Sequence, residues 1–108
     1  MAYSDFINML GIGVRAGKFE LGTCAVEKLI SRKKMQLLIL DKGLTARTID
    51  NFKSLCGDNK FKIIMIEKND FELKTKMNYK IIGVGDKKFA LALIDKFKED
   101  PYGGIGNE

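Results

Sequence analysis

Short apolar runs alternate with helical segments along this chain, and this alternation restricts its fold more than any other feature. Residues 37–40 and 81–84 are uninterrupted apolar runs of strand length, which is typical of strands buried on both faces of a sheet. Residues 61–66 predict a further strand, and residues 19–21 a short one. Strands that alternate with helices predict an α/β fold. We expect a three-layer α/β/α sandwich with a mixed sheet of about four strands.

The segments between these runs show helical periodicity, with apolar residues recurring on one face. A second helix is expected over about residues 22–33, and a short helical turn followed by a polar loop over 69–78. Helix ends are marked by residues that cap or break helices. These are Ser4 and Gly17 for the first helix, Thr45 or Thr48 and residues 57–59 for the third, and Asp86 for the last.

The composition excludes several classes of protein. A chain of 108 residues with 45% hydrophobic residues suits one domain, expected over residues 1–99 with a flexible tail over 100–108. No apolar run reaches the roughly 18 residues of a membrane span, and no basic region precedes an apolar stretch at the N-terminus. Histidine is absent, and Cys24 and Cys56 form no C-x-x-C pair. We therefore expect a cytoplasmic protein without metal, cofactor, small-molecule substrate or membrane contact.

Catalytic motifs are also weak. Residues 11–16 match the G-x-G-x-x-G/A spacing of dinucleotide-binding proteins, but a helical pattern precedes them and residues 31–37 hold no acid. Lys18 follows a glycine, but Phe19 stands where a phosphate-binding loop needs Ser or Thr. Cys24, near a helix start, could be a reactive thiol, although no base accompanies it. We do not expect an enzyme.

Positive charge is concentrated in two segments of a chain whose net charge is +5. Residues 15–47 hold eight cations against three acids, and residues 68–88 hold six lysines against three acids. These cations either form an ordinary solvated surface or meet in space as a phosphate-binding face.

The start of the second helix favours the second interpretation. Gly22 has no side chain to block a sugar–phosphate backbone, and Thr23 with the free N–H groups of the first turn can donate to a phosphate. Lys28 and Arg32 are four residues apart and therefore share one helix face. The alternative is an ordinary capped helix with a basic surface.

These motifs resemble those of a known family. Leu10-Gly11, Arg15-Ala16-Gly17-Lys18, Gly22 and Lys28 are similar to the L-seven-Ae/L-thirty-e superfamily of kink-turn RNA-binding proteins, and above all to its bacterial YlxQ-type members. The resemblance continues through residues 37–40 and 48–56, returns at 85–90, and spans about residues 5–97. It implies an α/β/α fold that binds kinked RNA helices or ribosomal RNA. In the family, the start of the second helix enters the kink, and a loop before the last strand contacts bases.

The resemblance also assigns individual residues. Gly22 matches the family glycine, Lys28 the family lysine, and Arg32 the basic residue one turn later. The Asn-Glu pair that reads tandem G·A pairs in archaeal members falls on Cys24 and Ala25, whose thiol and methyl cannot replace an amide and a carboxylate. We therefore expect recognition of RNA shape through its phosphates rather than of sequence.

The sequence thus predicts a non-enzymatic, ribosome-associated RNA-binding protein. Its candidate RNA-binding residues are Gly22, Thr23, Cys24, Lys28 and Arg32, with a wider basic footprint from Lys18, Lys33, Lys34, Lys74 and Lys76. Two alternatives stay open. One is a protein-interaction module on the same fold that has lost RNA binding; the other is an accessory domain of an RNA methyltransferase.

Overall fold

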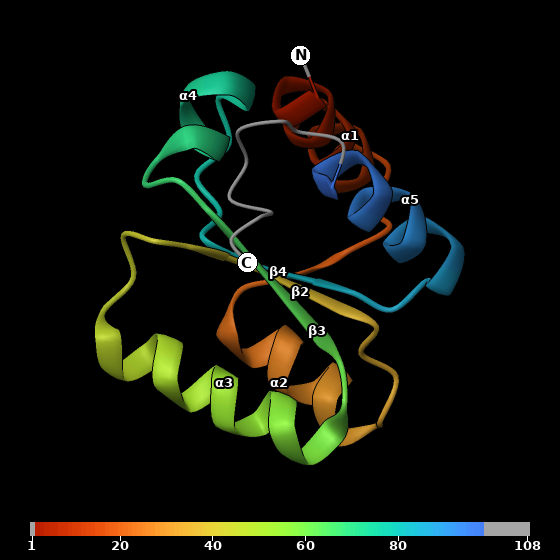
Figure 1. Ribbon diagram of the computed structural model, residues 1–108, viewed down its shortest axis with the longest axis vertical. Helices are drawn as coiled ribbons and strands as arrows, with labels where there is room; N and C mark the ends of the chain where they lie inside the picture. The colour runs from red at the N-terminus through yellow and green to blue at the C-terminus, as the bar shows by residue number, and fades with distance from the viewer. Residues whose placement is uncertain (1, 99–108) are drawn as a thin grey trace.

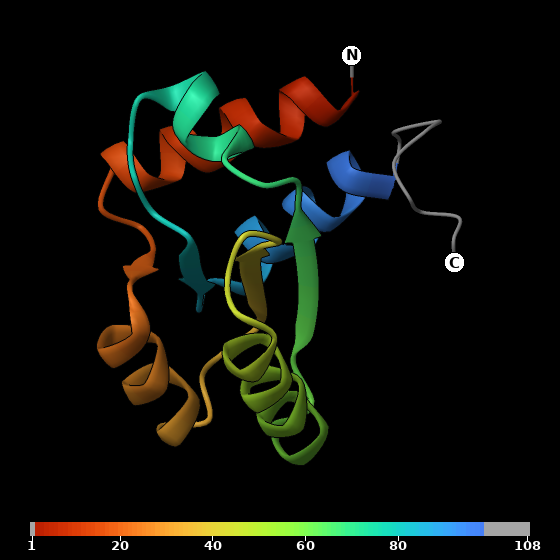
Figure 2. The same ribbon diagram turned by 90° about the vertical axis from the view of Figure 1, so that its left-hand side faces the viewer.

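The computed structural model describes residues 2–98, which form a three-layer α/β/α sandwich. Helices α1, α4 and α5 cover one face of the sheet, and α2 and α3 cover the other (Figure 1). The view turned by 90° shows the same layers (Figure 2). In chain order the elements are α1 (Ala2–Arg15), β1 (Glu20–Leu21), α2 (Thr23–Ser31), β2 (Leu37–Asp41), α3 (Ala46–Asn59), β3 (Lys62–Ile66), α4 (Asp70–Thr75), β4 (Ile81–Val84) and α5 (Lys87–Lys98). The predicted fold class is confirmed, whereas the tail over 100–108 lies outside the described residues.

The four strands form one mixed sheet in the order β1-β4-β2-β3. Strands β2 and β3 are parallel, and β4 runs antiparallel to both β1 and β2. The carboxyl ends of β1, β2 and β3 therefore meet the start of β4 at one edge, which we call the carboxyl edge. The opposite, amino edge holds the starts of β1, β2 and β3 and the end of β4. Helices α2 and α3 both begin at the carboxyl edge, because they follow β1 and β2.

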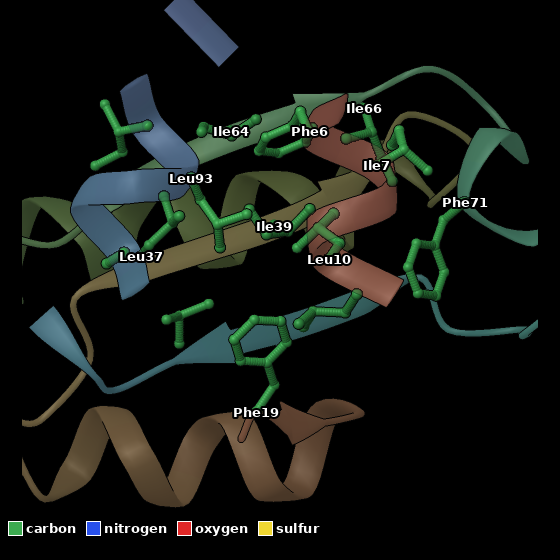
Figure 3. Close-up of a cluster of buried hydrophobic side chains, with 14 residues drawn as sticks. Phe6, Ile7, Leu10, Phe19, Leu37, Ile39, Ile64, Ile66, Phe71 and Leu93 are labelled. Atoms are coloured by element: carbon green, nitrogen blue, oxygen red, sulfur yellow. The ribbon is translucent and has the colours of Figure 1, made fainter. Parts of the chain in front are cut away.

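The core has one layer on each face of the sheet. Alternate residues of β2 point to opposite faces, so Leu37 and Ile39 pack under α1 and α5, whereas Leu38 and Leu40 pack against α2 and α3. Figure 3 shows the first layer, in which Phe6 of α1 lies above the sheet among side chains from several elements. Every residue of β2 and β4 is buried, as the apolar runs predict.

A buried carboxylate organises the carboxyl edge. Asp41, only 1% exposed, accepts hydrogen bonds from the N–H groups of Gly43 (2.6 Å) and Asn69 (2.9 Å). The Lys80 ammonium lies 3.8 Å from the same carboxylate and donates to the Asn69 side-chain oxygen at 2.7 Å. Asp41 thereby joins the loops after β2 and β3 to the segment before β4. The sequence alone gave no sign of this role of Asp41.

Two of the expected helix caps are correct and one is wrong. The Thr45 hydroxyl accepts from the Thr48 N–H at 3.3 Å, and Asp86 accepts from the Phe89 N–H at 3.0 Å. Ser4 is no cap, because α1 already includes Ala2. The first turn is instead held by Tyr3, whose hydroxyl accepts from the Glu67 N–H at 3.2 Å. Burial raises the pKa of this hydroxyl.

The expected helix stop at 57–59 is confirmed, because α3 ends at Asn59. The helix passes through Gly57, and its C-cap is Lys60, which adopts a left-handed conformation with φ 59°. The Lys60 N–H donates to the Cys56 carbonyl at 2.7 Å. A glycine inside a helix costs only about 1 kcal/mol, and packing of half-buried Leu55 and Cys56 against the second core layer outweighs this.

Two helical glycines give a matched test of this packing. Gly57→Ala should raise the free energy of unfolding by roughly 0.5–1 kcal/mol, because its new methyl meets no atom within 4 Å and alanine favours helix. Gly13→Ala should lower it, since overpacking costs about 1–3 kcal/mol and the methyl would lie 2.3 Å from the Phe19 ring. Urea unfolding of both variants measures this. Equal changes in the free energy of unfolding for the two variants would contradict both the packing of α1 against Phe19 and the extent of α3.

Candidate nucleic-acid interface

Gly22 forms an open corner between β1 and α2. Its φ of 87° and ψ of 167° lie in a region that only glycine adopts without strain. No atom lies within 4 Å of the position that a Cβ would occupy there. The Gly22 N–H donates to the Ile81 carbonyl at 3.0 Å and so fixes the corner to the start of β4. A sugar–phosphate backbone could therefore approach this main chain closely.

The first turn of α2 has free hydrogen-bond donors. The N–H groups of Thr23, Cys24 and Ala25 have no acceptor among the residues that the structure describes, and no side chain caps the helix. The same turn holds no acidic residue. Free N–H groups and the positive end of the helix dipole favour an anion at this position.

A groove runs along the same helix. It has a volume of about 380 Å³ and is lined by Glu20, Leu21, Cys24, Ala25, Lys28, Leu29 and Arg32. We call it the α2 groove. Lys28 and Arg32 lie one helical turn apart, both are exposed, and neither forms an ion pair within residues 2–98. The carboxylate of Glu20 is the acidic group in the lining, so the two cations give the groove a net positive charge.

The structure brings together only part of the predicted site. Cys24, Lys28 and Arg32 line the α2 groove, and Gly22 and Thr23 directly precede Cys24 at the carboxyl edge. Lys33 and Lys34 follow the end of α2 and lie at the amino edge, next to the start of β2. Lys18 precedes β1 at that same edge.

Lys74 and Lys76 lie on the other side of the sheet. Lys74 belongs to the last turn of α4, and Lys76 is its C-terminal cap. Helix α4 packs on α1, where a Cβ on Gly11 would come within 3.1 Å of Thr75. Neither lysine lines the α2 groove.

One exposed ring near the corner was missed by sequence reasoning. Tyr79 is 39% exposed and stands two residues before Ile81, whose carbonyl binds the Gly22 N–H. An aromatic residue in a polar loop before a strand was the available signal, but its closeness to Gly22 depends on the pairing of β4 with β1.

The remaining candidate groups, which are the cysteines and possible metal ligands, give little evidence of a functional site. Cys24 is exposed, whereas half-buried Cys56 donates from its thiol to the Phe61 carbonyl, as a packed core residue does. No cluster of three metal-ligating side chains occurs in the described part of the chain. Over the same residues, every helix is too short or too polar to cross a membrane.

Comparisons with known proteins agree with this fold. No family model and no curated protein matches the sequence. A solved structure of a protein with unknown function from Bacillus halodurans superposes with a TM-score of 0.77 at 20% identity, covering 86% of this chain and 96% of that one. The Giardia lamblia 15.5kD RNA binding protein superposes with a TM-score of 0.67 at 16% identity, covering 91% and 88%. At these identities the likeness shows a shared fold.

The Gly22 corner makes a direct prediction about stability. Gly22→Ala should lower the free energy of unfolding by about 1–3 kcal/mol, because an L side chain is strained at this φ and ψ although space is open around it. Urea unfolding of Gly22→Ala beside Gly57→Ala isolates the strain, since both new methyl groups meet no atom within 4 Å. If Gly22→Ala were as stable as the wild type, the corner would not have this conformation.

Proposed function

We propose that this chain binds structured RNA, with the α2 groove holding phosphates at a bend in the RNA. The observation that carries the proposal is the coincidence of two features on one helix. The free N–H groups of Thr23, Cys24 and Ala25 lie at its start, and Lys28 and Arg32 line the groove beside them.

The chemistry of the groove fits a phosphate backbone better than base edges. Main-chain N–H groups and cations bind phosphate oxygens, which supply affinity but little sequence information. Cys24 and Ala25 have neither the amide nor the carboxylate needed to read a base pair. We therefore propose recognition of RNA shape, namely of a bend that brings several phosphates to one helix end.

The comparisons support this proposal through one neighbour. The Giardia protein of the same fold is named as an RNA-binding protein. We extend this by proposing that the chain is a non-enzymatic, cytoplasmic member of the L-seven-Ae/L-thirty-e superfamily. YlxQ-type specificity, association with the ribosome and binding of kink-turns belong to the same proposal, as does a single domain over residues 1–99.

The residues outside the groove take secondary roles in this proposal. Tyr79 offers an exposed ring beside the corner, on which an unstacked base of the bend can lie. Lys74 and Lys76, which lie on the α1 side of the sheet, add to the long-range positive field that attracts RNA.

A double variant tests the groove. Lys28→Ala with Arg32→Ala should weaken binding to an RNA hairpin bent by an internal bulge. It should also reduce the slope of log affinity against log salt by about 1.4–1.8, because each neutralised phosphate contributes roughly 0.7–0.9. Fluorescence anisotropy at several salt concentrations measures both quantities.

Lys53→Ala with Lys96→Ala is the matched control, because it removes the same charge from α3 and α5. Equal losses of RNA affinity and of salt slope in the two double variants would contradict RNA binding localised at the α2 groove. Absence of RNA binding in the wild type, together with a protein partner recovered after nuclease treatment, would support the alternative that the fold is a protein-interaction module. Cys24 and Ala25, in place of a base-reading pair, are the observation that favours that alternative.

A further inference from the structure

Lysines from three segments meet at the amino edge of the sheet, away from the free N–H groups at the start of α2. The Gln36 N–H donates to the Val84 carbonyl at 2.9 Å, and the Lys62 N–H donates to the Gln36 carbonyl at 3.4 Å. The Lys34 carbonyl lies 3.4 Å from the Cβ position of Gly85. These contacts join the segments after α2, after α3 and before α5. Their lysines, which we call the amino-edge lysines, are Lys33, Lys34, Lys60, Lys62, Lys87 and Lys88.

These lysines form a dense and unneutralised positive patch. Neighbouring strands are about 4.8 Å apart, so the ends of β4, β2 and β3 span roughly 10 Å of backbone. All six side chains are exposed, and none of them forms an ion pair within residues 2–98. The acids on these segments are Asp58 and Asp86, and Asp86 is engaged as the cap of α5.

The patch has the chemistry of a surface for nucleic-acid backbone. Like charges within the screening length of about 8 Å repel one another, and a polyanion relieves that repulsion. Surfaces for single strands add exposed aromatic rings on which bases stack. The rings on these segments are covered, since Phe61 is buried and Phe89 packs on Phe19. Lysines without exposed rings suit the phosphates of a double helix.

The patch is continuous with the α2 groove. Arg32 lines the groove and directly precedes Lys33 at the amino edge. The nine residues of α2 place Arg32 roughly 13 Å from the free N–H groups at the helix start. This distance is too long for one phosphate to bridge, so the patch and the N–H groups at the start of α2 must contact different parts of a ligand.

We propose that the amino-edge lysines bind the sugar–phosphate backbone of an RNA helix that flanks the bend held in the α2 groove. The inference rests on the proposed function and adds a second contact surface on the same RNA. If this inference holds, the length of one flanking RNA helix affects the affinity. If the α2 groove alone bound the RNA, the affinity would depend only on the bend.

The test uses bent hairpins with the same internal bulge and different stems. One RNA has short stems on both sides, and in two others each stem in turn is one helical turn longer. Wild-type protein should bind one of the long RNAs roughly tenfold more tightly than the short one. Lys62→Gln with Lys87→Gln and Lys88→Gln should remove most of that gain. It should also reduce the salt slope on the long RNA by about 2–3, since three phosphate contacts are lost.

The same triple variant should bind the short RNA within about twofold of wild type, because none of its residues lines the α2 groove. The control variant is Lys53→Gln with Lys68→Gln and Lys96→Gln, which removes the same three charges from other parts of the surface. It should keep the gain in affinity that the longer stem gives. The inference is overturned if neither longer stem tightens binding, or if the two triple variants behave alike. A wild-type protein that binds the short RNA without any gain from longer stems contradicts this inference alone, whereas no binding to any of the RNAs contradicts the proposed function as well.

Discussion

The hydrogen bond from the Gly22 N–H to the Ile81 carbonyl sets the geometry of the carboxyl edge. It joins the end of β1 to the start of β4, and it fixes the residue from which α2 begins. Because Gly22 turns the chain without a side chain, the helix starts with no capping group and with its first N–H groups free. Asp41 holds the adjoining loops through the Gly43 and Asn69 N–H groups. These hydrogen bonds hold the main chain beside the α2 groove in place, as a preorganised binding site requires.

Charge is distributed in the structure differently from its distribution along the chain. The positive segment over 15–47 contributes to two surfaces, since α2 carries cations from the groove to the amino edge. In the second positive segment, Lys74 and Lys76 lie at α4 on one side of the sheet, whereas Lys87 and Lys88 begin α5 at the amino edge. The lysines of these two segments meet only because β4 pairs antiparallel with β2, which brings Gly85 beside Lys34. The geometry of this contact depends on topology rather than on sequence spacing.

Local patterns in the sequence were enough to predict most of the fold. Uninterrupted apolar runs located the buried strands, because a strand covered on both faces needs apolar residues at every position. Thr45 and Asp86 were identifiable as caps from their positions before helical segments. The end of α3 within 57–59 was also predictable, although the helix passes through Gly57 itself because tertiary packing of its last turn outweighs the weak intrinsic preference of one glycine.

The candidate site was predictable only where its residues share one element. Lys28 and Arg32 could be grouped in advance because helical spacing alone places them together. Lys74 could not be placed, since its side of the sheet depends on the packing of α4 against α1. Tyr79 and Asp41 were missed for a related reason. The neighbours of both residues come from strand pairing and loop contacts distant in sequence.

The central claim is that the free N–H groups at the start of α2 receive RNA phosphates. The most direct measurement is an NMR titration of the backbone amides with the bent hairpin. The account predicts that the largest and saturable changes in chemical shift occur at Thr23, Cys24 and Ala25. It would be contradicted if the hairpin bound while these three amides kept their free shifts and the changes fell on α4 and the adjoining face of α1.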